Sequence, residues 1–105
     1  MFGKYISVVT ADVEKAVEDE FNRWYNEQHV GEVLACPGWL RGARYRALDG
    51  EPRYMAVYEM QSPDAMWTLE LQAIKGFGPF WSKLESYHSR IYERIHHDER
   101  GTRAR

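Results

Sequence analysis

Hydrophobic residues along this 105-residue chain change their spacing several times, and the order of these changes limits the folds open to it. Residues 2–10 alternate with a period of two, which predicts a strand. Residues 10–30 then follow the helical period, which predicts a long amphipathic helix. The apolar positions of this strand and helix are Phe2, Ile6 and Val8, then Val13, Val17, Phe21, Trp24, Tyr25 and Gln28.

Capping and breaking residues set the predicted ends of this helix. Thr10 or Asp12 can cap its start, and acidic residues crowd its first turns. Gly31 weakens it near its end. Pro37 and Gly38 should stop it, since proline disfavours helix at the preceding residue and glycine permits a turn.

A hairpin is predicted next. Residues 39–48 and 53–60 alternate as strands around a turn that contains Gly and Pro. A period of two puts Trp39, Ala43 and Tyr45 on one face of the first of these strands.

A second helix is predicted over residues 62–76. Ser62 is its expected cap, Pro63 stands at its first position, and Gly76 closes it.

The elements predicted for the C-terminal part of the chain complete the order of strands and helices. Residues 77–84 are too rich in Gly and Pro to be regular, apart from a short helical turn around Trp81. Residues 86–95 alternate as a strand, with a helix as the main alternative. The resulting β-α-β-β-α-β order predicts an α+β fold of the ferredoxin-like type, an antiparallel sheet with both helices on one face.

Bulk properties exclude several classes of protein. The length favours a single domain over residues 1–97, and residues 98–105 read as a frayed basic tail. A net charge of −2 with mixed signs argues against nucleic acid, and no apolar run could span a membrane. One cysteine, Cys36, and no signal-peptide pattern favour the cytoplasm.

The uncovered face of the predicted sheet needs a partner. Aromatic residues make up 14% of the chain, more than a minimal core requires. A second copy of the chain is one cover, so a homodimer through the sheet faces is expected.

Three segments resemble the dimeric α+β barrel superfamily, and specifically its EthD-like branch. They are residues 21–47, 50–60 and 78–84, with Trp24, Tyr25 and His29 on the first helix, Pro37-Gly38 before the second strand and a Tyr-rich third strand. Gly31 stands where such proteins often have proline. The resemblance implies a homodimer with a small-molecule cleft between sheet and helices in each subunit, but it implies no single reaction.

His29 is the leading candidate for chemistry. It flanks the apolar face of the first helix, and an imidazole can exchange a proton at neutral pH without a cofactor. The alternative is a helix-end histidine that bonds carbonyls or pairs with Glu32.

Aromatic side chains are the candidates for the walls of a ligand pocket, although most could instead belong to the core or to a dimer interface. Tyr58 is the preferred second catalytic residue, because its hydroxyl could polarise a substrate oxygen. The candidate substrate-binding residues are Trp24, Tyr25, Trp39, Tyr45 and Trp81.

Other clusters have simpler explanations. Arginines 41, 44, 46 and 53 could hold a carboxylate, but cross-strand pairs with Glu51 and Glu59 are favoured. His88, His96 and His97 lack the spacing of a metal site, and Cys36 is expected to be a buried thiol. No metal and no cofactor are expected, and a haem ligand cannot be told from other histidines by sequence.

These observations predict a small-molecule enzyme acting on a hydrophobic aromatic or polyketide-like compound. The expected chemistry is cofactor-independent proton transfer of the cyclase, isomerase or decarboxylase type. The alternatives are a cofactor-free monooxygenase of phenols and a non-catalytic binding or accessory protein of a catabolic pathway.

Overall fold

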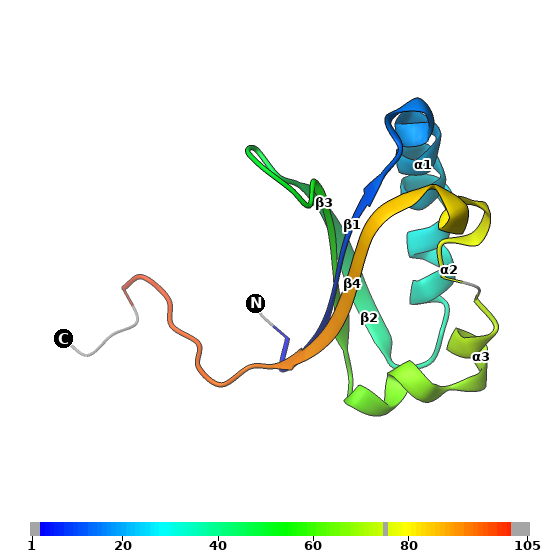
Figure 1. Cartoon of the computed structure of the whole chain (residues 1–105). Helices are drawn as coiled ribbons and strands as arrows, with labels where there is room; N and C mark the ends of the chain where they lie inside the picture. Colours follow the sequence, from blue (N-terminus) through cyan, green and yellow to red (C-terminus); the bar gives the residue numbers. More distant parts are fainter. Residues whose placement is uncertain (1–2, 75, 102–105) are drawn as a thin grey trace.

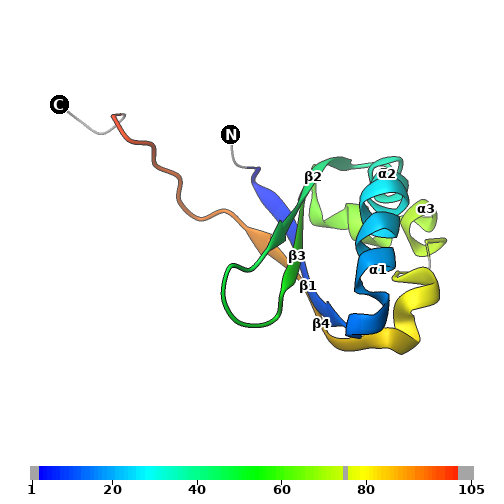
Figure 2. The same ribbon diagram turned by 90° about the horizontal axis from the view of Figure 1, so that it is seen from above.

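The computed structural model describes residues 3–74 and 76–101. Its four strands form one antiparallel sheet in the order β2-β3-β1-β4. They are β1 (Tyr5–Val13), β2 (Trp39–Arg46), β3 (Tyr54–Met60) and β4 (Leu84–Glu93). All helices lie on one face of the sheet (Figures 1 and 2). The predicted ferredoxin-like architecture is confirmed.

The first helical segment is continuous and has four parts. In chain order these are a 3₁₀ turn (Lys15–Val17), α1 (Glu18–Trp24), a π-helical turn (Tyr25–His29) and α2 (Val30–Leu34). It therefore runs past Gly31, and it ends before Pro37 as predicted.

The predicted helix caps at Thr10 and Asp12 are wrong, because β1 continues to Val13. The Asp12 carboxylate accepts hydrogen bonds from the backbone N–H of Arg53, at 2.7 Å, and from the Ser86 hydroxyl, at 3.4 Å. Asp12 thus ties β1 to the hairpin and to β4 instead of capping a helix.

The predicted continuous helix over residues 62–76 is also wrong. A 3₁₀ turn (Pro63–Trp67) and a short α3 (Leu69–Gln72) replace it, and residue 75 lies outside the described residues. The break is at Thr68, whose backbone is extended and whose side chain accepts the Leu71 N–H at 3.2 Å. A hydroxyl that caps the next turn competes with helix continuation.

The predictions for the C-terminal third are confirmed. A 3₁₀ turn (Gly78–Lys83) contains Trp81, and β4 follows as a strand rather than a helix. Beyond β4 the chain extends away from the helices, on the uncovered side of the sheet (Figures 1 and 2). Residues 102–105 of the predicted frayed tail lie outside the described residues.

A bulge in β2 corrects the predicted faces of this strand. The register shifts between Trp39 and Arg41, so one extra residue enters the strand there. Trp39 therefore faces the helices, whereas Ala43 and Tyr45 face the uncovered side. Ile6 and Val8 of β1 also face that side, opposite the buried Ser7 and Ala11, and Phe2 lies outside the described residues.

Aromatic rings form the centre of the core between sheet and helices. Phe21 is fully buried, and the rings nearest to it are those of Phe80 at 5.4 Å, Tyr25 at 5.6 Å and Phe77 at 6.0 Å between centroids. Edge-to-face contacts such as those with Tyr25 and Phe80 add stabilisation beyond simple burial.

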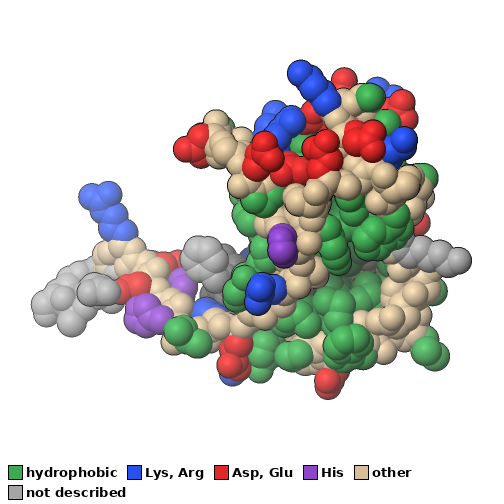
Figure 3. Space-filling view, viewed as in Figure 1, with side chains coloured by type: hydrophobic (Ala, Val, Ile, Leu, Met, Phe, Trp, Pro, Cys, Tyr) green, Lys and Arg blue, Asp and Glu red, His purple; other side chains and the backbone are tan. Residues whose placement is uncertain are grey.

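The outer surface divides by side-chain type. In the space-filling view, acidic side chains gather at the end where α1 begins, and hydrophobic ones reach the surface between β4 and the helices (Figure 3). No helix in the described part of the chain is long and apolar enough to cross a bilayer.

Candidate functional site

A cavity of about 200 Å³ lies between the helix-facing side of the sheet and the helical layer. Its walls come from all four strands on one side, and from the π-helical turn, α2, α3 and the segment between α3 and β4 on the other. Four of the predicted site residues line it, which are Tyr25, His29, Trp39 and Tyr58. This central cavity occupies the position expected from the family resemblance.

His29 ends the π-helical turn, which brings its ring against two aromatic side chains. It stacks on Trp24 at 4.7 Å with an interplanar angle of 15°, and it meets Tyr25 edge-on at 4.8 Å. The side chain is buried, and Nδ1 has no hydrogen-bond partner among the described residues. Such π turns are frequent at functional sites, because the extra residue redirects side chains.

The environment of His29 favours its neutral form. Burial lowers the pKa of His29 below its usual value of 6.5, and the nearby Glu32 carboxylate only partly opposes this. Glu32 Oε1 lies 3.7 Å from Nδ1, which is beyond hydrogen-bonding distance, and its side chain is 44% exposed. A neutral imidazole can accept a proton at neutral pH.

Tyr58 projects from β3 into the same cavity. Its ring packs edge-on against Trp39 at 5.5 Å between centroids, and it lies directly over Gly42 of β2. The Tyr58 hydroxyl is buried and forms no hydrogen bond of good geometry in the described part of the chain, although Tyr25 is near enough to add to the rise of its pKa. Burial raises the pKa of Tyr58 strongly, so the hydroxyl stays protonated and can donate.

The Tyr58 ring leaves no room for a side chain at residue 42, so this position requires glycine. A Cβ at residue 42 would lie 2.7 Å from Cδ1 of Tyr58. We expect Gly42→Ala to move this ring and to lower the free energy of unfolding by about 1–3 kcal/mol, as overpacking does. The measurement is urea unfolding.

Gly31→Ala is the matched control for this change. Gly31 is exposed on α2, and nothing lies within 4 Å of an added Cβ. The control should stabilise the protein by up to about 1 kcal/mol, because alanine favours helix. Equal stability of Gly42→Ala and wild type would contradict the packing of Tyr58 described above.

Tyr25 forms the wall between the central cavity and the hairpin. Burial raises the pKa of Tyr25, so its hydroxyl is also protonated. On the hairpin side the Arg44 guanidinium lies 4.2 Å from the centre of the Tyr25 ring. Such a cation–π contact holds the ring in place.

Three predicted substrate-binding residues do not line the central cavity. Trp24 lies behind His29 and orients it by stacking. Trp81 is 48% exposed and packs against Phe77 and Tyr87 outside the cavity. Tyr45 is on the opposite side of the sheet, because the bulge in β2 separates it from Trp39.

Sequence reasoning missed several residues of the central cavity. The most prominent are Phe77, Tyr87 and Ser7, joined by Met66, Leu71 and Ile74. Tyr87 shares a face with Ser89 and Ile91 by the alternation of β4, so its side was readable from sequence. Phe77 lies in a segment without periodicity, and no sequence signal marks it.

The other predicted clusters are structural. Arg41 of β2 pairs with Glu59 of β3 across the hairpin as predicted, but Arg53 pairs with Glu18 of α1 rather than with Glu51. Cys36 is a buried free thiol, as expected, and burial raises its pKa.

His88, His96 and His97 are the histidines that come nearest to a metal-binding pattern in the sequence. Within residues 3–74 and 76–101, no three His, Cys, Asp or Glu side chains are placed to hold a metal ion. His96 pairs with Asp98 at 3.8 Å, and His88 lies apart on β4.

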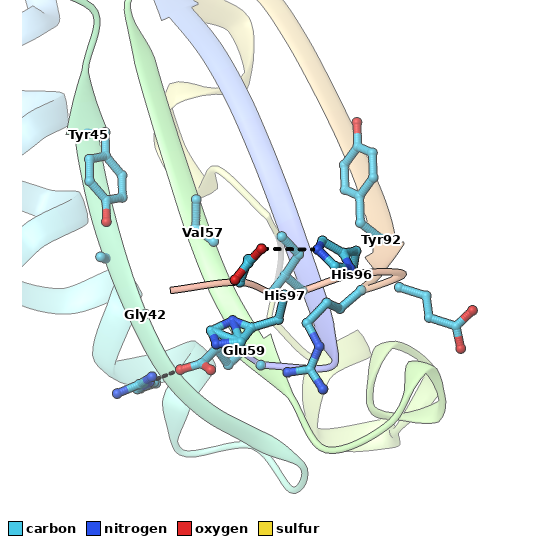
Figure 4. Close-up of a pocket in the computed structure, with 14 residues that line it drawn as sticks. Gly42, Tyr45, Val57, Glu59, Tyr92, His96 and His97 are labelled. Carbon is cyan, nitrogen blue, oxygen red and sulfur yellow. Dashed lines mark ion pairs between the residues drawn. The ribbon is translucent and has the colours of Figure 1, made fainter. Parts of the chain in front are cut away.

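A second hollow of about 650 Å³ lies on the uncovered face of the sheet. Figure 4 shows Tyr45, Val57 and Tyr92 on the strands, with His96 and His97 of the C-terminal segment in front of them. The Arg41–Glu59 ion pair lies at its edge. This hollow is larger than the central cavity.

Comparison with known proteins supports the fold. The family model described as "Domain of unknown function (DUF4286)" matches residues 4–78. No curated protein sequence matches the chain significantly.

Three solved structures show the similarity. The haem-degrader MhuD from Mycobacterium tuberculosis, solved with two haems bound, is 18% identical, with 90% of this chain and 99% of that chain covered and a TM-score of 0.67. The cofactor-independent oxygenase SnoaB from Streptomyces nogalater is 16% identical over 90% and 97% of the two chains, with a TM-score of 0.67. A dabb family protein with a ferredoxin-like fold from Mesorhizobium loti is 9% identical over 88% and 97%, also at 0.67.

These neighbours confirm the ferredoxin-like fold that the resemblance implied. None of the three names the EthD-like branch, which stays a prediction.

Proposed function

The chain belongs to the family described as domain of unknown function DUF4286, and because that description assigns no activity, we propose its function from the central cavity. We propose a cytoplasmic small-molecule enzyme that removes a proton from a weakly acidic, hydrophobic substrate. His29 is the base, and Tyr58 donates a hydrogen bond to the substrate oxygen. Single-ring phenols and enolisable cyclic ketones are the substrate classes.

One observation carries this proposal. Two buried polar groups with no hydrogen-bond partner among the described residues, His29 Nδ1 and the Tyr58 hydroxyl, belong to residues that line the same largely apolar cavity. Unpaired buried polar groups are costly and cluster at functional sites. A neutral base and a protonated donor around one space are the two groups that enolate or phenolate formation needs.

The size of the central cavity limits the substrate. Its volume of about 200 Å³ is below the roughly 300–1,000 Å³ typical of sites for drug-sized ligands. A molecule of one ring, or of two small fused rings, fits this space better than a larger polyketide. Haem does not fit the cavity in this conformation, so we assign it no role.

The test is a ligand screen by thermal shift with phenols, aromatic acids and cyclic ketones, followed by an assay for turnover. A compound that raises the melting temperature and is consumed supports the proposal. Binding without turnover by any ligand would favour the non-catalytic accessory protein instead.

The second candidate function is a cofactor-free monooxygenase. It shares the first step, because removal of a phenolic proton gives an anion that can react with dioxygen. The structural similarity to SnoaB, whose description names a cofactor-independent oxygenase, favours this candidate. Dioxygen consumption with a phenol, measured by an oxygen electrode, separates it from a cyclase, isomerase or decarboxylase.

We also propose that the protein is a homodimer through the uncovered face of the sheet. Apolar side chains of all four strands line the hollow there, among them Ile6, Ala43, Val57 and Tyr92. An antiparallel sheet with one exposed apolar face commonly buries it against a partner.

A charge on the uncovered face should break the dimer. Val57 lies near its middle, next to Val8 in the register with β1 and Ala43 in that with β2. We expect Val57→Lys to raise the dissociation constant at least about thirtyfold, measured by analytical ultracentrifugation, since a lysine there loses its hydration on assembly. Leu48→Lys is the control, because Leu48 is fully exposed on the hairpin loop. A wild type that is monomeric at all concentrations would contradict the dimer.

A further inference from the structure

Arg44 differs from Arg41 and Arg53, two other arginines of the hairpin. Arg41 and Arg53 each pair with a carboxylate. The Arg44 guanidinium instead donates to the side-chain oxygens of Asn26, at 2.8 Å, and Asn22, at 2.9 Å. Among the described residues no carboxylate forms an ion pair with it. Amide oxygens hold a guanidinium in place but do not neutralise its charge.

Arg44 lies against Tyr25, whose side chain forms one wall of the central cavity. The guanidinium lies 4.2 Å from the centre of the Tyr25 ring, and Tyr25 itself lines the cavity. Nε of Arg44 is buried and has no hydrogen-bond partner in the described part of the chain. Because Arg44 is half-buried, water screens its charge less than that of a surface arginine.

The field of Arg44 reaches the ionisable groups of the central cavity. It lowers the pKa of Tyr25 and Tyr58 against the larger effect of burial, and it lowers the pKa of His29 in the same direction as burial does. The field therefore favours anions and disfavours a protonated imidazole. Glu32, beside His29, acts in the opposite sense and has the larger effect on the pKa of His29, whereas the pKa of Tyr25 and of Tyr58 responds to Arg44 and not to Glu32. No effect of the neighbouring Arg46 on the pKa of Tyr25, Tyr58 or His29 stands beside that of Arg44.

We propose that Arg44 is a specificity-determining residue, which makes the central cavity select the anionic form of its ligand through the Tyr25 ring on which it lies. This inference rests on the proposed function and adds the charge of the bound species to it. Neutral His29 brings no charge to the site, so the fixed positive charge must come from elsewhere. Arg44 supplies it without touching the ligand.

The test uses 4-nitrophenol, whose phenolate absorbs visible light, so that the pKa of the bound molecule can be read directly. In wild type, bound 4-nitrophenol should ionise at lower pH than free 4-nitrophenol. Arg44→Met keeps the length of the side chain and removes its charge. We expect it to raise the pKa of the bound phenol by about one, a tenfold change in its ionisation constant.

Two further variants separate charge from structure. Arg44→Lys keeps the charge and should retain most of the wild-type ionisation constant. Arg46→Met removes the same charge two residues further along β2, where the guanidinium is exposed and 5.9 Å from the Tyr54 ring, and it should behave as wild type. Circular dichroism and the unfolding midpoint check that each variant folds.

The outcomes distinguish this inference from the proposed function. An unchanged pKa of bound 4-nitrophenol in Arg44→Met would overturn the role of Arg44 and leave the cavity as a binding site. An equal change in Arg46→Met would also overturn it, since the effect would then be one of net charge. If wild type does not bind 4-nitrophenol at all, both the proposed phenol site and the role of Arg44 fail.

Discussion

Replacing His29 with glutamine is expected to lower the rate of proton removal in the central cavity by about 10²–10⁴-fold, the usual contribution of a positioned general base. Glutamine has a similar reach and polarity but accepts no proton at neutral pH. A suitable substrate is 5-nitrobenzisoxazole, a small fused-ring compound. When a base takes the proton from its ring carbon, the electrons of that bond form a nitrile, and the N–O bond breaks to release a coloured phenolate.

The pH dependence of the reaction rate is a second test of the role of His29. Because burial lowers the pKa of His29 below 6.5, the imidazole should stay neutral and active through pH 7. The rate should fall only as the pH drops through the lowered pKa. The stability should follow the same direction, since below pH 6.5 the unfolded chain binds more protons at this residue than the folded chain does.

His88→Gln is the matched control for this experiment. His88 is an exposed histidine of β4 on the side of the sheet away from the helices, and it should have wild-type activity. A His29→Gln variant with wild-type kcat/KM would show that His29 is not the base. In that case its stacking on Trp24 would be its main role.

Replacing Phe21 with alanine should have the largest effect on stability. The Phe21 side chain is fully buried. It contacts five aromatic rings, which are those of Trp24, Tyr25, Tyr54, Phe77 and Phe80. Removing it leaves a cavity at the centre of the core, so we expect the free energy of unfolding to fall by about 3–5 kcal/mol. This loss is a large fraction of the roughly 5–15 kcal/mol that stabilises a typical domain.

The measurement is urea unfolding at one fixed protein concentration, because the proposed dimer would make the midpoint depend on concentration. Trp67→Ala is the control, since it removes a larger ring that is 71% exposed. It should change the free energy of unfolding by less than about 1 kcal/mol. A loss below about 1.5 kcal/mol for Phe21→Ala would contradict the central place of this ring in the core.

Much of the fold could be predicted because it follows from local chemistry. The alternation in β1, β3 and β4, the helical spacing around Phe21 and the stop at Pro37 all act over a few residues. Predictions from the local sequence were wrong where a side chain contacts a residue that is far away in the sequence. The Asp12 carboxylate binds Arg53 and Ser86, and Trp39 Nε1 donates to the carbonyl of Ala65 at 3.1 Å.

The candidate site was predicted only in part for a related reason. His29, Tyr25, Trp39 and Tyr58 were identified by residue type and placement on elements, and the structure brings them around one cavity. Tyr45 was misplaced because a one-residue bulge reverses the faces of a strand. No periodic signal reveals such a bulge.

The sequence by itself determined the order of the elements and the aromatic helix that carries His29. Tertiary structure alone decided which side chains share the central cavity, which polar atoms are left without partners, and that Arg44 bonds to two amide oxygens instead of a carboxylate. The physical reason is the range of the forces involved. Periodicity and capping act within a few residues, whereas burial, ring packing and the field of Arg44 depend on residues that meet only when the sheet and helices pack together.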